Sequence, residues 1–102
     1  MVLLHLLAER ESYGYEVAQR LQAAGFADVL EGTVYPALTR LEREGRLATR
    51  LVPSPSGPAR KYYRLTDAGH EALAAAGAAW RRHVTGVEAV LARPIPAAKE
   101  GS

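Results

Sequence analysis

A chain of 102 residues can bury about two thirds of the surface that it exposes when unfolded, so it fits one small domain with apolar surface left for a partner. It contains no cysteine, which excludes disulfides, thiolate metal sites and cysteine nucleophiles. Its net charge is only +2, but the segment 46–64 carries +5 and no acidic residue, so the rest of the chain carries −3.

The amino-terminal part is expected to be helical. Leucines at helical spacing predict a first helix over 2–9, which is too short for a membrane span and lacks the basic start of a signal peptide, so we expect a cytoplasmic protein with no membrane association. Ser12 is expected to cap a second helix within 13–24. The residues that face inward from this helix are Gly14, Val17, Ala18 and Leu21.

A third helix is expected to follow a turn. Gly25 ends the second helix, and Phe26, Val29 and Leu30 are expected to pack beneath the turn. The third helix is predicted to start near Thr33, which would place Pro36 in its first turn, and to end at Gly45. Val34, Leu38 and Leu41 should face inward. The outer face then consists of Thr33, Pro36, Thr39, Arg40 and Arg43, with Tyr35 at its edge.

The basic segment has the pattern of a β-hairpin. Strands are predicted over 47–52 and 60–65, with the six turn-forming residues 53–58 between them. Tyr63 and Leu65 should face the core, and Arg60, Tyr62 and Arg64 the opposite side. A helix followed by a basic hairpin is typical of winged-helix proteins that bind DNA.

A long last helix is expected after the hairpin, capped by Thr66 and with Asp67 at its positive end. Its apolar residues alternate spacings of four and three, which is the pattern of a coiled-coil seam. The domain has nothing left to cover this seam, so a homodimer is predicted. The seam residues are Leu73, Gly77, Trp80, Val84, Val87 and Leu91.

Three stretches together resemble the PadR family of transcriptional regulators: SYGYE over 12–16, GTVYPALTRLE over 32–42 and RKYYRLTDAG over 60–69. The resemblance covers roughly residues 3–91. It implies a mainly α fold with a small β-hairpin: a winged helix-turn-helix DNA-binding domain over 1–65, a single carboxyl-terminal dimerisation helix over 66–92 and a disordered tail over 93–102. The first helix is a few residues shorter than is usual in the family.

The resemblance also implies a function. Such a protein is a dimeric repressor that binds an inverted repeat in double-stranded promoter DNA and is released when a small aromatic effector binds. In the major groove, Arg40 would reach guanine edges, and Thr33 or Thr39 would meet phosphate, a base or a thymine methyl. Tyr35 would either contact phosphate or pack against the second helix, and Tyr15 would either lie near the DNA backbone or belong to the core.

The basic residues of the hairpin would neutralise phosphates. They are Arg60, Lys61 and Arg64, with Arg50 across the hairpin. The alternative is a solvated edge strand that its charge keeps from aggregating.

Trp80 is the only tryptophan, and it is surrounded by the small residues Ala76, Gly77 and Ala79. It would either pack in the dimer core or stack on a planar ligand at the seam. His83 lies near it in sequence.

An enzyme is not expected. The three histidines are far apart, and no metal-binding spacing, cofactor motif or glycine-rich phosphate loop occurs in the sequence. The alternative to a DNA-binding regulator is a winged helix that serves as a protein-interaction module without binding DNA.

Overall fold

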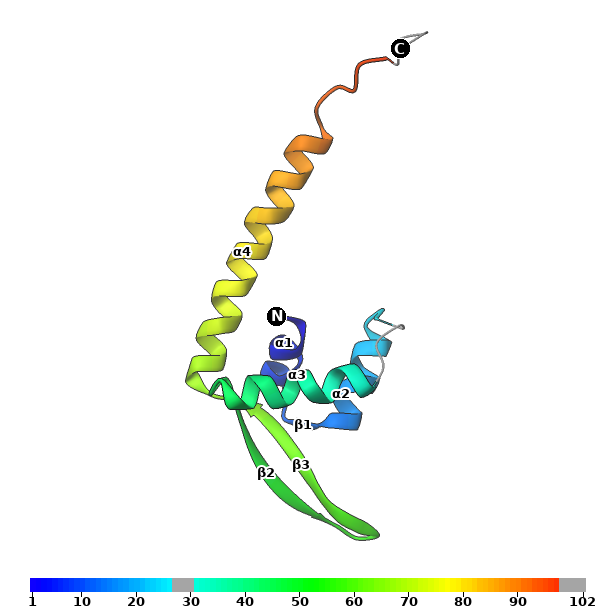
Figure 1. Ribbon diagram of the computed structural model, residues 1–102, viewed down its shortest axis with the longest axis vertical. Helices are drawn as coiled ribbons and strands as arrows, with labels where there is room; N and C mark the ends of the chain where they lie inside the picture. Colours follow the sequence, from blue (N-terminus) through cyan, green and yellow to red (C-terminus); the bar gives the residue numbers. More distant parts are fainter. Residues whose placement is uncertain (27–30, 98–102) are drawn as a thin grey trace.

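The computed structural model describes residues 1–26 and 31–97 of the chain. In this part the helices and strands follow one another as α1 (Val2–Glu9), β1 (Ser12–Tyr13), α2 (Gly14–Ala23), α3 (Glu31–Arg43), β2 (Leu47–Ser54), β3 (Gly57–Leu65) and α4 (Asp67–Leu91). The first three helices form a small cluster, the β2–β3 hairpin projects from it, and α4 extends in the opposite direction (Figure 1). This is the expected winged helix-turn-helix with one long carboxyl-terminal helix.

The apolar spacing of α1 and α2 predicts most of their buried residues, although Leu3, which was expected on the buried face of α1, is only partly buried. The core contains Leu4 and Leu7 from α1 and Val17, Ala18 and Leu21 from α2. These helices therefore supply one wall of a single apolar cluster, as expected for amphipathic helices of a small domain.

The prediction that Ser12 caps α2 is wrong. Ser12 lies in β1, is fully buried and accepts a hydrogen bond of 2.9 Å from the Arg20 guanidinium. Tyr13 precedes α2 and makes no capping bond with its side chain. The reason is long-range pairing: β1 aligns Ser12 with Tyr63 and Tyr13 with Tyr62, which holds Ser12 in an extended strand.

The end of α2 is a left-handed glycine turn. Gly25 has φ +109°, and the Phe26 amide donates to the Leu21 carbonyl at 3.0 Å. The expected burial of Phe26 is wrong, since this residue is 44% exposed. Val29 and Leu30, which were expected to pack beside it, lie outside the described residues.

The third helix begins at Glu31, two residues before the predicted cap Thr33. Pro36 therefore lies inside the helix and not in its first turn. Proline keeps a helical φ and forgoes one hydrogen bond to the preceding turn, so the helix continues through it. The inward face is as predicted: Val34, Leu38 and Leu41 are buried.

The β2–β3 hairpin, which we call the wing, is longer than predicted. The strands extend to Ser54 and Gly57, so the turn contains two residues, 55–56, and not the six of 53–58. The sheet order is β1-β3-β2, which makes β2 an edge strand that tolerates Pro53, where the register shifts. Leu47, Tyr63 and Leu65 complete the core from the root of the wing, as predicted for the last two.

The root of α4 is tied to the turn between α3 and β2. The predicted cap is confirmed, since the Thr66 hydroxyl accepts from the Gly69 amide at 3.1 Å. The same hydroxyl donates to the Gly45 carbonyl at 2.6 Å, and the Thr66 amide donates to the Arg46 carbonyl at 3.2 Å. Gly69 is buried against that carbonyl, so α4 begins in close backbone contact with the rest of the domain.

Candidate nucleic-acid interface

The outer face of α3 is available for contact with a partner. Its buried side faces the core, whereas the side predicted to face DNA is exposed. The Arg40 side chain is 70% exposed and lies 3.9 Å from the Glu44 carboxylate. The exposed residues of this face are Thr33, Tyr35, Pro36, Thr39, Arg40 and Arg43.

Tyr35 joins α3 to the start of α2. A methyl group on Gly14 would lie within 3.0 Å of ring atoms of Tyr35, so the ring rests directly on the glycine. The residue is nevertheless 42% exposed. The sequence left phosphate contact and packing against α2 as alternatives. The ring packs against α2, and because it is also exposed, a phosphate contact stays a prediction. Tyr15, in the first turn of α2, is also exposed.

The basic residues of the wing lie on two faces of β3, because side chains of a strand alternate. Lys61 shares a face with Tyr63, and its ammonium lies 5.5 Å from the centre of that ring. Arg60 is on the other face, where its guanidinium lies 4.6 Å from the centre of the Tyr13 ring. Arg64 is exposed on the same face as Arg60. The three cations thus belong to one hairpin but project from different faces of its strand.

Two carboxylates neutralise cations of the wing. Glu42 on α3 accepts hydrogen bonds from Lys61 at 2.9 Å and from Thr49 at 2.8 Å. The Nε–H of Arg50 is shared between the two carboxylate oxygens of Glu11, before β1, at 2.9 Å from each, and Nη2 of Arg50 donates to Oε1.

These bonds lower the pKa of both carboxyl groups. The bond from Lys61 is the largest cause for Glu42, and the bond from Arg50 is the largest for Glu11. In return, the bond to Glu42 raises the pKa of Lys61. Sequence reasoning missed these pairs, because 19 and 39 residues separate the partners.

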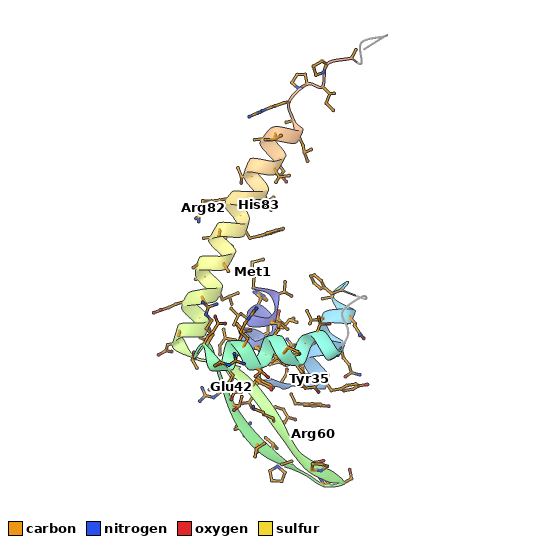
Figure 2. The ribbon with its side chains drawn as sticks, viewed as in Figure 1. Met1, Tyr35, Glu42, Arg60, Arg82 and His83 are labelled. Carbon is orange, nitrogen blue, oxygen red and sulfur yellow. The ribbon has the colours of Figure 1, made fainter. Side chains whose placement is uncertain are left out.

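A hollow of about 330 Å³ lies where α2, α3 and the wing meet. Its lining combines two cations with three phenol rings and has no acidic residue: Tyr13, Gly14, Tyr35, Arg60, Lys61 and Tyr63. Figure 2 shows Tyr35 on α3 and Arg60 on the neighbouring wing. Cations and hydroxyl donors at the edge of an exposed helix face suit an anion such as a phosphate.

Half of the predicted seam on α4 is exposed. Trp80, Val87 and Leu91 are 53%, 42% and 77% exposed, whereas Ala76, Gly77 and Val84 are partly buried. Leu73 was predicted to belong to the uncovered seam, but it packs against the core of its own domain.

Trp80 was expected to be surrounded by small residues, but a longer side chain lies beside one of them. The Arg81 side chain occupies the space beside Gly77, with an Nη 3.3 Å from where a methyl would lie. The Trp80 and His83 rings are 5.7 Å apart. Nearer the end of α4, an apolar hollow of about 500 Å³ is lined by Arg82, His83, Gly86, Val87, Val90 and Leu91.

Over residues 1–26 and 31–97, no three histidine or acidic side chains come together in a way that could hold a metal ion. In the same ranges, no helix has the length and apolar character needed to cross a membrane.

Residues 3–75 match the model of the transcriptional regulator PadR-like family. The chain is 42% identical over 73 residues to the transcriptional regulator Rv3488 of Mycobacterium tuberculosis, an alignment that covers 70% of this chain and 64% of that protein. The match to a second curated relative, from Lysinibacillus sphaericus, also spans 64% of its length.

Solved structures match a larger share of the chain than these relatives do. A PadR-like transcriptional regulator from Bacillus cereus has a TM-score of 0.81 and 36% identity, covering 91% of this chain and 90% of its own. A Streptococcus transcriptional regulator has a TM-score of 0.80 and 36% identity, covering 87% of each chain. The chain therefore belongs to the PadR-like family of transcriptional regulators.

Proposed function

We propose that this protein is a cytoplasmic, dimeric repressor that binds an inverted repeat in promoter DNA and is released by a small aromatic effector. In this proposal residues 1–65 bind DNA, 66–92 join two protomers, and 93–102 form a disordered tail. Family membership supports regulation of transcription, and the surface of α3 and the wing supports DNA as the partner.

The observation that carries the proposal is the continuity between the exposed face of α3 and the cationic hollow. We propose that α3 enters the major groove, with Thr33, Thr39 and Arg40 toward the bases and backbone. Tyr35 and Arg60 would then meet a phosphate at the hollow, which Lys61 also lines. The remaining contacts would come from Tyr15, Pro36 and Arg64.

The exposed seam on α4 supports dimerisation. A helix that leaves its domain with Trp80, Val87 and Leu91 exposed has apolar surface that a second copy would cover. A two-fold dimer would place its two α3 helices in successive major grooves, about 34 Å apart. The proposed binding site is therefore a palindrome with one half-site for each protomer.

An effector at the seam would act only by binding the DNA-free dimer more tightly than the DNA-bound dimer. Trp80 is the proposed contact for a flat aromatic molecule, because its ring is half exposed and lies beside that of His83. Quenching of tryptophan fluorescence by such compounds tests this step, because Trp80 is the only tryptophan of the sequence. A compound that binds in calorimetry without quenching this fluorescence, or with unchanged affinity for Trp80→Phe, would count against it.

The decisive experiment is selection of bound sequences from a random duplex library by the purified protein. Recovery of a palindrome is expected, and Arg40→Ala should weaken binding to it by about 1 to 3 kcal/mol if the guanidinium reads a guanine. A protein-interaction module without DNA binding would enrich no sequence and show no salt-sensitive affinity for duplex.

A further inference from the structure

Glu42 connects three elements at the root of the wing. It lies in the last turn of α3, and its two carboxylate oxygens have different partners, one in β3 and one in β2. Oε1 accepts from the Lys61 ammonium and Oε2 from the Thr49 hydroxyl. Figure 2 shows Glu42 near the point where α3 meets the wing. The orientation of this carboxylate is thereby fixed between the helix and the hairpin.

The position of Glu42 is unfavourable for helix stability and for DNA binding alike. A negative charge in the last turn opposes the helix dipole. It also lies beside the surface that we propose to meet phosphates, which it would repel. The partners explain its place in the fold, because Lys61 and Thr49 both stabilise the ionised carboxylate.

The wing cations consequently differ in their availability. Lys61 is engaged by Glu42, although its side chain remains 44% exposed. Arg60 instead lies over the Tyr13 ring, and no carboxylate within residues 1–26 and 31–97 forms an ion pair with it. A count of basic residues in the sequence therefore overstates the charge that the wing offers to a polyanion.

We propose that Glu42 is a specificity-determining residue that withholds Lys61 from phosphates and so lowers affinity for non-specific duplex DNA. This inference rests on the proposed function. Non-specific binding comes almost entirely from neutralised phosphates, so each cation that is held back weakens it. Base contacts from α3 do not depend on Lys61. Withholding Lys61 therefore lowers the affinity for a specific site by a smaller proportion than the affinity for non-specific duplex.

The test is the salt dependence of binding to a labelled duplex of random sequence, measured by fluorescence anisotropy with the full chain. Glu42→Gln should raise the affinity at low salt and steepen the log–log salt slope by about 0.9, which corresponds to an additional loss of about 3.5-fold between 50 and 200 mM salt. Glu71→Gln on α4 makes the same charge change on an exposed residue away from the wing and should not steepen the slope.

A double-mutant cycle distinguishes withholding of Lys61 from simple charge repulsion. In a Lys61→Gln background, Glu42→Gln should no longer steepen the slope. The same steepening in that background would overturn the proposal, because Glu42 would then act on DNA without Lys61. An unchanged slope for a folded Glu42→Gln variant would overturn it as well.

A second comparison does not depend on the folding of Glu42→Gln. Lys61→Gln should reduce the salt slope clearly less than Arg60→Gln, because Lys61 is paired with Glu42, whereas Arg60 has no carboxylate partner in the described part of the chain. Equal reductions would overturn the inference. If the wild-type chain had no salt-sensitive affinity for duplex, the proposed function itself would fail, which separates the two outcomes.

Discussion

Gly69 is the position where a single methyl group should disturb the junction between α4 and the DNA-binding domain. A Cβ built on this residue would lie well within 3.0 Å of the Arg46 carbonyl oxygen, 3.2 Å from its carbonyl carbon and 3.1 Å from Leu65 Cγ. Two of these atoms belong to the backbone, so rotation of a flexible side chain cannot relieve the overlap. Gly69→Ala must therefore separate α4 from the turn before β2.

The expected change in the free energy of unfolding is the sum of three contributions. Overpacking of a rigid contact costs about 1 to 3 kcal/mol. The Arg46 carbonyl also accepts the 3.2 Å hydrogen bond from the Thr66 amide, whose loss costs about 1 kcal/mol. Alanine in a helix gains about 1 kcal/mol over glycine. The net expectation is a destabilisation of about 2 kcal/mol, which lowers the Tm of a chain of this size by about 10 °C.

Thermal unfolding followed by circular dichroism measures this effect, at one protomer concentration for all variants because dimer stability depends on concentration. Gly86→Ala on the same helix is the matched control. A Cβ there meets no atom within 4 Å, so the helix gain should raise stability by up to about 1 kcal/mol. A Tm for Gly69→Ala at or above that of the wild type would refute the reasoning.

Three further predictions concern the interface, pH and the dimer. Gly14→Ala should displace the Tyr35 ring at a cost of about 1 kcal/mol in stability and weaken duplex binding in a mobility-shift assay; unchanged binding would contradict the role of Tyr35. The pKa values of Glu11 and Glu42 are lowered in the folded state, so their stabilisation is complete above the ordinary carboxyl range near pH 4 and is lost as the pH falls through the lowered values. An acid titration of Tm should therefore be flatter for Glu11→Gln than for the wild type. Val87→Asp should dissociate the proposed dimer, because an unpaired carboxylate would be buried in the seam; light scattering that still shows a dimer would disprove this arrangement.

The helices were predictable because their burial follows a local period. The spacing of Val34, Leu38 and Leu41 identifies the inner face of α3 wherever the helix begins. The wing was harder to delimit from sequence. Pro53 and Pro58 are turn formers by composition, but β2 is an edge strand and the outer part of β3 extends beyond its short pairing with β1, so both prolines fit within strands.

The candidate site was predictable in its residue types but not in its electrostatics. The alternation of β3 already places Arg60 and Lys61 on opposite faces. Their different neighbours, Tyr13 and Glu42, come from elements distant in sequence, and no local pattern indicates them. Ser12 illustrates the same limit, because a favourable capping residue became a buried strand residue once β3 paired with it.

The root of α4 explains how a change at the proposed seam could reach DNA. Thr66 and Gly69 attach α4 to the Gly45–Arg46 turn, which is also the connection between α3 and β2. Close-packed backbone contacts do not deform gradually, so α4, α3 and the root of the wing should move as one body. Within the proposed dimer, a ligand that rotates one α4 against its partner would therefore alter the separation of the two α3 helices. Loosening that root, as in Gly69→Ala, should weaken this coupling even where the seam itself is intact.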